Sequence, residues 1–566
     1  MTELVAAMQE WPTVLPGLEG GRPRRRALAG RLELPGSGRA ADGVALLVVV
    51  AAVVATFWYV DRFAVNVVLS DQWADVGLIH QAHSGTLTLN SLWAQHNENR
   101  ILFPDLVVLA LAYTTHFNVV VEDYLNGALL VLSTVLVIGA HKRRSPLLHW
   151  IRYCPVVLAL LSFDLLASAL FGFQLSWFLV LFGLAAAISL LDRRDLTWPF
   201  LIASVVVAVV GSFSSLQGLF IWPAGLVLLY LRGRPKSFLL AWIVCAVVTG
   251  AVYFFHFDTS ATGDSGSYAF THPLLAARVF FTTVGDGVGV RLQAPHQGYS
   301  GNDPILLVGA LITVVAVWAI IYGFRSGRST GSPVGVALVV FGLLFAVSIA
   351  VGRPKLGPSN ASRYLPFAVT VWVGCYLALF DRPIAWTREA WSARLTQVDY
   401  LFGVRKRPDS ASIGGHRTSA NSRQRVVDLA ARVVLVGLIV VQLASGLEFG
   451  LIDAHSWHKR EVAAANVMVN IHRESDSVVQ RKLGTYPVPF LREMTQFMRD
   501  QRLGLFAGRA NPDGSSGTEG NVRHKGGSIT GAGVVWERKP DFTPPGSSRT
   551  PRRPRRTSIC RSITFG

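Results

Sequence analysis

Residues 197–255 read TWPFLIASVVVAVVGSFSSLQGLFIWPAGLVLLYLRGRPKSFLLAWIVCAVVTGAVYFF. The stretch holds three apolar runs, at 197–212, 217–231 and 237–255, and the connection 232–236 between the last two is basic. Runs of this length suit α-helices that cross a hydrocarbon core about 30 Å thick. The stretch therefore predicts three successive transmembrane helices, with positive charge concentrated on one side of them.

The same pattern covers most of the 566 residues. Hydrophobic residues make up 51% of the chain and charged residues only 16%, whereas about 25% of the residues in a soluble domain are charged. The composition excludes a soluble globular protein. We predict an all-α multi-pass membrane protein with about eleven transmembrane helices. The runs that could span lie near 43–60, 124–140, 154–171, 174–191, 197–212, 217–231, 237–255, 304–324, 334–351, 364–380 and 433–451.

The net charge of +18 comes from 53 Lys and Arg against 35 Asp and Glu. In a membrane protein such an excess is first expected on cytoplasmic connections, so it indicates orientation and not nucleic-acid binding. The arginine-rich segment 1–42 leads into the first run without a cleavage pattern, which predicts a cytoplasmic N-terminus and an uncleaved first span. The basic connections that follow are then cytoplasmic, and they lie near 142–152, 193–194, 232–236, 325–328 and 382–432.

This sidedness divides the chain into domains and predicts an external C-terminus. The transmembrane domain is 43–451, with a small external helical appendage at 452–508 and a disordered basic tail at 509–566. Residues 101–115 contain Pro104 and Asp105 and are expected to form a helix along the outer membrane surface. Three external loops follow from these assignments, at 61–123, 256–303 and 352–363.

Ionisable residues crowd the first external loop. If residues 71–83 are helical, Asp71 and Asp75 share one face, and the same spacing would pair His96 with Arg100. A carboxylate, an imidazole and a guanidinium at the lipid boundary could remove a proton from a hydroxyl group and hold a phosphate. An ordinary loop with solvated charges is the alternative that these residues leave open.

A second cluster of cations flanks the short loop 352–363. Arg353, Lys355 and Arg363 lie there, directly before Tyr364 and a late span. They suit the phosphate of a lipid carrier at headgroup level, and contact with ordinary lipid headgroups is the alternative. Within the spans, Asp164 is either a functional residue or a paired structural acid.

Several short motifs, taken together, resemble bacterial members of the GT-C superfamily, which are multi-pass glycosyltransferases that use polyprenyl-phosphate sugars. The resemblance implies that an acidic residue in the first external loop is catalytic or metal-associated, and Asp71 occupies that position. Gln72 stands where the family usually has a second acid, so a divalent cation stays open as the cofactor. The motifs are Asp71-Gln72-Trp73, His96-Asn97-Glu98-Asn99-Arg100, Gly172-Phe173-Gln174, Gln217-Gly218, Trp222-Pro223 and Ser362-Arg363-Tyr364.

We therefore expect a hexosyl or pentosyl transferase that moves a sugar from a polyprenyl-phosphate donor to an envelope glycan or protein acceptor on the external face. Asp71 would be the base, and His96 and Glu98 would orient the acceptor or the base. The donor phosphate would meet Arg100, Arg353, Arg363 and Tyr364. A transporter or flippase for lipid-linked sugars is the alternative, but the ionisable residues gather at one membrane edge and the chain shows no internal repeat.

Overall fold

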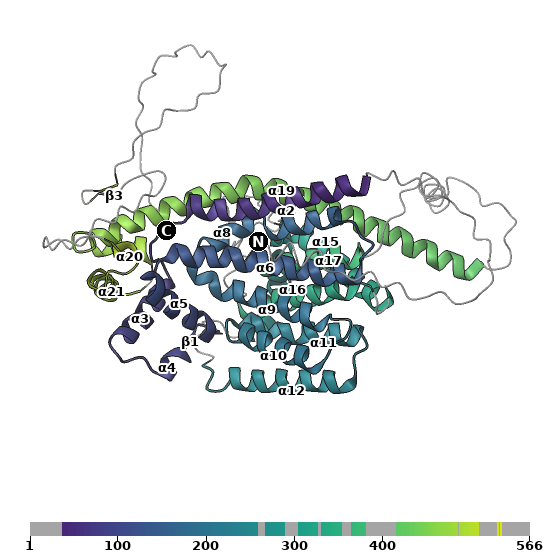
Figure 1. Ribbon diagram of the computed structural model, residues 1–566, viewed down its shortest axis with the longest axis horizontal. Coiled ribbons are helices and arrows are strands. Elements are labelled where there is room, and N and C mark those ends of the chain that lie inside the picture. The colour runs from purple at the N-terminus through teal and green to yellow at the C-terminus, as the bar shows by residue number, and fades with distance from the viewer. Residues whose placement is uncertain are drawn as a thin grey trace, which may run out of the picture.

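The computed structural model describes residues 37–258, 267–288, 304–326, 330–353, 364–380, 415–484 and 486–508, together with two short strands after them. Its helices run side by side along the long axis of the molecule, with α19 and α2 at one edge and α12 at the other (Figure 1). The prediction of an all-α multi-pass membrane protein is confirmed.

Seven of the described helices are long and apolar enough to cross a membrane, and a bent pair could make an eighth span. These helices are α2 (Ser37–Phe63), α6 (Val119–Arg144), α9 (Leu175–Leu191), α12 (Lys236–Tyr253), α15 (Pro304–Ser326), α16 (Ser332–Gly352) and α19 (Gly415–Val469). The bent pair is α7 (Cys154–Leu160), which follows η1 (Trp150–Tyr153), and α8 (Phe163–Ala169). Shorter apolar helices are α5 (Leu102–Thr115), α10 (Trp198–Ser212), α11 (Ile221–Leu231) after η3 (Leu216–Phe220), and α17 (Leu365–Leu379).

Every predicted apolar run falls on one of these helices or on the bent pair. The remaining elements connect or cap the bundle. They are α3 (Gln72–His83), α4 (Leu89–Leu92), β1 (Gln95–His96), β2 (Asn99–Arg100), η2 (Gly172–Gln174), α13 (Ser267–Thr271), α14 (Pro273–Asp286), α20 (Asp476–Leu483), α21 (Val488–Asp500), η7 (Gly504–Phe506), β3 (Ile529–Thr530) and β4 (Gly533–Val534).

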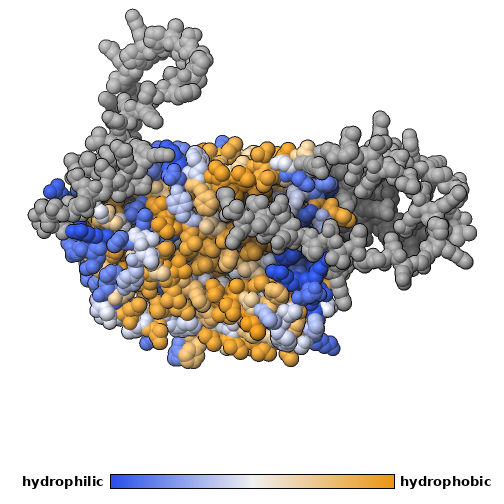
Figure 2. Space-filling model, in the orientation of Figure 1, coloured by the Kyte–Doolittle hydropathy of each residue, from blue (hydrophilic) through white to orange (hydrophobic). Residues whose placement is uncertain are grey.

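Small residues let neighbouring helices approach closely. A Cβ atom added to Gly335 of α16 would lie 2.4 Å from the carbonyl oxygen of Gly374 in α17, so a side chain at this position would collide with the partner backbone. Such contacts are typical of membrane helices, which associate through close packing because lipid is as apolar as their side chains. The outer faces of α2 and α12 stay apolar, and a broad hydrophobic band crosses the surface between two hydrophilic edges (Figure 2).

Helix α5 covers the residues expected to lie along the membrane surface. The backbone N–H of Phe103, near its start, donates to the carbonyl of Phe213, and the carbonyl of His116, just after its end, accepts from Gly504. Phe213 is the C-cap residue of α10, and Gly504 begins η7, just after the helix α21 that packs on α3. The start of α5 is therefore attached to the end of α10, and its end to the appendage.

The bend of 46° between α7 and α8 lies inside the run predicted at 154–171. Helix α19 packs against this break, where the side-chain amide of Gln442 donates to the carbonyl of Ala159 at 3.3 Å. Asp164, one residue into α8, is buried, and its carboxylate lies against Gly446 of α19. The break is thus covered by a neighbouring helix, and the two interpretations of Asp164 both stay open.

Several predicted segments lie wholly or partly outside the described residues. Most of the N-terminal segment 1–42 and most of the tail 509–566 do, although β3 and β4 pair as antiparallel strands within the tail. In the loop 352–363 the description ends at Arg353, so Lys355 and Arg363 are not described. The loop 256–303 is described as far as 258 and again at 267–288.

Candidate functional site

Residues 95–100 form a tight hairpin at the end of the bundle where α3 and α5 lie (Figure 1). Strand β1 pairs with β2 so that His96 faces Asn99 and Gln95 faces Arg100, and Asn97 in the turn has a φ of 51°. The expected helical pairing of His96 with Arg100 is therefore wrong. In an antiparallel pair, residues directly opposite each other lie on the same face, and neighbours along one strand lie on opposite faces. His96 is the neighbour of Gln95, the residue opposite Arg100, so the side chains of His96 and Arg100 point to opposite faces.

His96 is half-buried, and the charges of the other two catalytic candidates, Asp71 and Glu98, act on it. Its ring packs on Phe173, with centroids 4.9 Å apart, and its Nε2 atom is buried with no hydrogen-bond partner among the described residues. Burial lowers the pKa of His96, while the negative charges of Asp71 and Glu98 act in the opposite direction. Asp71, His96 and Glu98 thus lie within reach of one another's charges, and burial favours the neutral form of the imidazole.

Glu98 connects this group to the cation cluster. Its carboxylate forms an ion pair with the guanidinium of Arg353, and the same guanidinium donates to the hydroxyl of Tyr364 at 3.2 Å. The ring of Tyr364 is buried and stacks on Trp177 at 5.7 Å. Arg353 and Tyr364 come from the end of α16 and the start of α17, far from Glu98 in the sequence, and the described part of the chain brings all three to one place.

Arg100 has a different environment from the one expected. Its guanidinium is buried and donates to the backbone carbonyls of Trp93, Tyr253, Phe255 and His256, at distances from 2.6 to 3.2 Å. It also lies over the ring of Trp93, at 4.8 Å from the centroid. These contacts attach the hairpin to the end of α12 and favour a structural role for Arg100 over the expected phosphate contact.

Asp71 is half-buried at the N-cap position of α3, and its side chain makes no capping hydrogen bond. Helix α3 begins directly after it, so the prediction of a helix over 71–83 is confirmed. Asp75, one turn later, is 3% exposed and its Oδ2 atom has no partner in the described structure. Burial and the charges of Glu122, Asp105 and Asp71 raise the pKa of Asp75 well above its usual range. Of the two carboxyl groups, Asp71 is therefore the one open to solvent and to substrates.

The sequence analysis missed a group of buried acids behind Asp75. Glu122 and Asp123 are fully buried in the first turn of α6, which begins five residues before the apolar run predicted at 124–140. The amide of Gln72 donates to Glu122 at 3.4 Å, and that carboxylate fills the space beside Gly172. Two adjacent acids beside an apolar run were the signal that could have revealed them, because buried carboxylates are costly.

The appendage closes one side of the site. The carbonyl of Leu483, at the end of α20, accepts from the backbone N–H of Ser70 and from the indole of Trp73, both at 3.0 Å. The ring of Phe490 in α21 contacts α3 at Gly77, and Tyr486 stacks on it with centroids 5.3 Å apart. Asp71 is thus fixed between the transmembrane domain and the appendage.

The described residues include no group of three or more His, Cys, Asp or Glu side chains arranged to hold a metal ion. Gln72 is turned inward against Glu122 and does not take the place of a second external acid.

Comparison with known proteins gives similarity at the level of structure. No family model and no curated protein sequence matches the chain. The solved structure of ArnT from Cupriavidus metallidurans in the apo state is 16% identical, covers 82% of this chain and 89% of its own, and has a TM-score of 0.40. The structure of the same protein bound to undecaprenyl phosphate is 14% identical, with coverages of 81% and 89% and a TM-score of 0.41.

The archaeal oligosaccharyltransferase AglB from Archaeoglobus fulgidus, in complex with an inhibitory peptide and a dolichol-phosphate, is 12% identical. The aligned region covers 79% of this chain and 60% of the AglB chain, with a TM-score of 0.41.

Proposed function

We propose that this chain is a membrane glycosyltransferase that moves a sugar from a polyprenyl-phosphate donor to an acceptor hydroxyl or amide group. The observation that carries the proposal is the meeting of Asp71, His96 and Glu98 with Arg353 at one end of an apolar helical bundle. A proton acceptor and a cation lie there at the level where a lipid-borne donor and a water-borne acceptor can meet.

The reaction assigns a separate task to each group. The acceptor oxygen or nitrogen attacks the anomeric carbon of the donor sugar, and the bond from that carbon to the phosphate oxygen breaks with both electrons leaving on the phosphate. The acceptor proton passes to the carboxylate of Asp71, which is half-buried and makes no capping bond. His96, whose buried Nε2 atom has no partner among the described residues, orients the acceptor through a group other than the attacking oxygen or nitrogen.

Negative charge builds up on the departing polyprenyl phosphate, so a cation there stabilises the transition state more than the ground state. Arg353 is the described cation at this place, and Glu98 and Tyr364 fix its guanidinium. Arg363 remains a further candidate for the phosphate. The donor is proposed to be a polyprenyl-phosphate-linked hexose or pentose, and the acceptor an envelope glycan or protein.

The proposed orientation places the N-terminus in the cytoplasm and the candidate site outside the membrane. Ser84 is exposed beside the site, and Arg194 is exposed at the opposite end of the bundle. In a variant freed of its native cysteines, Ser84→Cys should be labelled by an impermeant maleimide in intact cells, and Arg194→Cys only after lysis. Labelling of Arg194→Cys alone in intact cells would reverse the orientation.

Purified protein in proteoliposomes tests the proposed reaction directly. A labelled polyprenyl-phosphate sugar is supplied with envelope material from cells that lack the protein, and the label is followed into glycan or protein. Transfer of label with release of polyprenyl phosphate supports the enzyme. Movement of the intact labelled lipid between leaflets, with no transfer, would instead support the transporter or flippase.

A further inference from the structure

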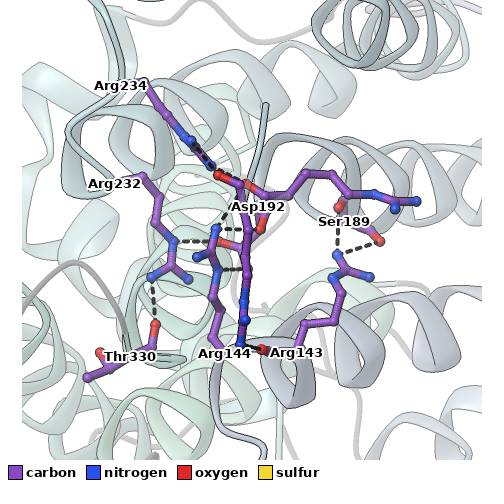
Figure 3. A network of polar contacts seen from close by, with 9 residues as sticks. Arg143, Arg144, Ser189, Asp192, Arg232, Arg234 and Thr330 are labelled. Carbon is purple, nitrogen blue, oxygen red and sulfur yellow. Dashed lines mark hydrogen bonds and ion pairs between the residues drawn. The ribbon is translucent and has the colours of Figure 1, made fainter. Parts of the chain in front are cut away.

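The end of the bundle opposite to the candidate site gathers arginines from three segments (Figure 3). Arg143 and Arg144 end α6, and Arg232 and Arg234 follow α11. Between them lies the connection after α9, where Asp192 is followed by two further arginines, Arg193 and Arg194. All of these residues come from connections that the sequence predicts to be cytoplasmic.

Asp192 neutralises part of this charge. Its side chain is fully buried, and its carboxylate accepts from Nε of Arg232 at 2.5 Å and from Nε of Arg144 at 3.3 Å. Arg232 also donates to the carbonyl of Thr330, which precedes α16, at 2.6 Å. One anion is therefore shared between two buried guanidinium groups, and the set keeps a positive charge.

Most of the other guanidinium contacts are to backbone carbonyls, which carry no net charge. Arg144 donates to the carbonyls of Asp192 and Arg193, at 2.8 and 2.9 Å, and Arg234 donates to those of Arg193 and Arg194. Arg143 donates to the carbonyl of Ser189 at 2.7 Å and to the hydroxyl of Ser189 at 3.2 Å. The guanidinium groups of Arg144 and Arg234, the inner arginines, thus hold the backbone of the turn 192–194 in place. These contacts leave the positive charges unneutralised.

The positive charge of the cluster exceeds its negative charge. Six arginines are opposed by Asp192 and Asp195 alone among the acids of these segments, which leaves four positive charges, six minus two. Burial lowers the pKa of Arg234, and the charge of Arg144 lowers it further. An anion placed against this surface would relieve that repulsion.

The two outermost arginines are available to such an anion. Arg193 and Arg194 are both exposed. Within the described chain the guanidinium of Arg193 lies over the ring of Phe200, at 4.8 Å from the centroid, and makes no hydrogen bond, and that of Arg194 makes one, to the carbonyl of Arg143 at 3.4 Å. The backbone carbonyls of both residues are held by the inner arginines, so the turn that carries them is fixed in place. Fixed, exposed guanidinium groups are suited to bind phosphate oxygens in pairs.

Aromatic residues indicate where this surface lies relative to the lipid. Trp198 begins α10 just after the turn and is 50% exposed, and Tyr230 ends α11 just before Arg232 and is 62% exposed. Exposed tryptophan and tyrosine at the ends of apolar helices are typical of the headgroup level of a bilayer. The anion at this level is therefore one carried by a lipid.

We propose that Arg193 and Arg194, backed by Arg144 and Arg234, form a binding site for the phosphate of an anionic phospholipid on the membrane face opposite to the candidate active site. This site does not depend on the proposed transferase function. Basic pockets between membrane helices bind anionic headgroups in this way, and each exposed cation contributes measurably to the affinity.

The full-length protein in detergent tests the site. It is incubated with mixed micelles of phosphatidylglycerol and phosphatidylcholine, and the retained lipids are counted by native mass spectrometry. The wild type should retain phosphatidylglycerol over phosphatidylcholine, and Arg193→Gln with Arg194→Gln should reduce that preference by about tenfold. The matched control, Arg473→Gln with Arg481→Gln, removes two exposed arginines of the appendage and should leave the preference unchanged.

Three outcomes would overturn the proposal. The wild type could retain both lipids equally, a result that needs no variant to fold. The control pair could lose the preference as fully as the test pair, which would make the attraction diffuse. Inorganic phosphate at millimolar concentration could displace the lipid completely, which would make the site one for free anions.

Discussion

The two ends of the helical bundle hold their buried acids differently. At the basic end, the carboxylate of Asp192 accepts from two guanidinium groups. At the other end, Asp75 and Asp123 are equally buried, yet each has at least one carboxylate oxygen without a partner in the described structure. Buried acids with ion-pair partners stabilise the fold. Buried acids with unpaired oxygen atoms are typical of functional sites, where some local stability is lost.

The largest expected effect on stability belongs to the basic end. Asp192→Ala leaves Arg144 and Arg232 buried without their anion, and breaking a buried pair in this way destabilises by roughly 3–5 kcal/mol. Unfolding of the purified protein in detergent, followed by temperature or denaturant, measures the loss. Asp195→Ala is the control, because Asp195 is exposed and surface changes stay within about 0.5 kcal/mol. Equal losses for the two variants would show that the Asp192 pairs do not hold the bundle.

At the candidate site the corresponding ion pair should matter for the donor more than for folding. Arg353→Gln removes the cation that faces the departing phosphate in the transition state, so kcat, and with it kcat/KM, for a polyprenyl-phosphate sugar should fall by about tenfold or more. Arg353→Lys keeps the charge and should recover part of the loss. Arg62→Gln, which changes an exposed arginine at the end of α2, is the control. A kcat/KM that is unchanged in Arg353→Gln would remove this residue from the donor site.

A smaller effect concerns Asp105, where burial raises the pKa of the carboxyl group to about 8. The unfolded carboxyl group has a pKa near 3.9, so between these values the native state holds a proton that the unfolded state has released. The stability that this proton contributes is therefore fully present below about pH 4 and is lost as the pH rises towards 8. Asp105→Asn cannot titrate, so between pH 6 and 8 it should lose about 2 kcal/mol less stability than the wild type.

Melting temperatures taken at intervals of half a pH unit measure this difference. Asp61→Asn is the control, because Asp61 is exposed at the same end of the bundle. Parallel pH profiles for the wild type and Asp105→Asn would mean that Asp105 is ionised in the folded protein.

The sequence predicted the helices well because a membrane span is encoded in local composition. It also predicted that the catalytic candidates and the phosphate-binding candidates lie on one side of the membrane, since connections on one side end at the same level. It did not predict the contacts of Arg100, because three of its four carbonyl partners lie more than 150 residues away at the end of α12. Such partners follow from packing and leave no periodic signal in the sequence.

The buried acids were missed for a different reason. Glu122 and Asp123 interrupt the apolar pattern, so the predicted span began after them, whereas the helix begins at Val119. The hairpin at 95–100 was missed because its turn uses Asn97 with a positive φ in place of glycine. In both cases tertiary contacts override the local pattern.

The most direct test of the central claim is the rate of sugar transfer by Asp71→Asn in proteoliposomes. The substitution keeps the size and most hydrogen bonding of the side chain but removes its basicity, so transfer should fall by on the order of 10² or more. Asp61→Asn, reconstituted in the same amount, should transfer at the wild-type rate. If Asp71→Asn inserts normally and transfers sugar at a near-native rate, Asp71 is not the base, and Asp75, Glu98 or Asp164 must be tested in its place.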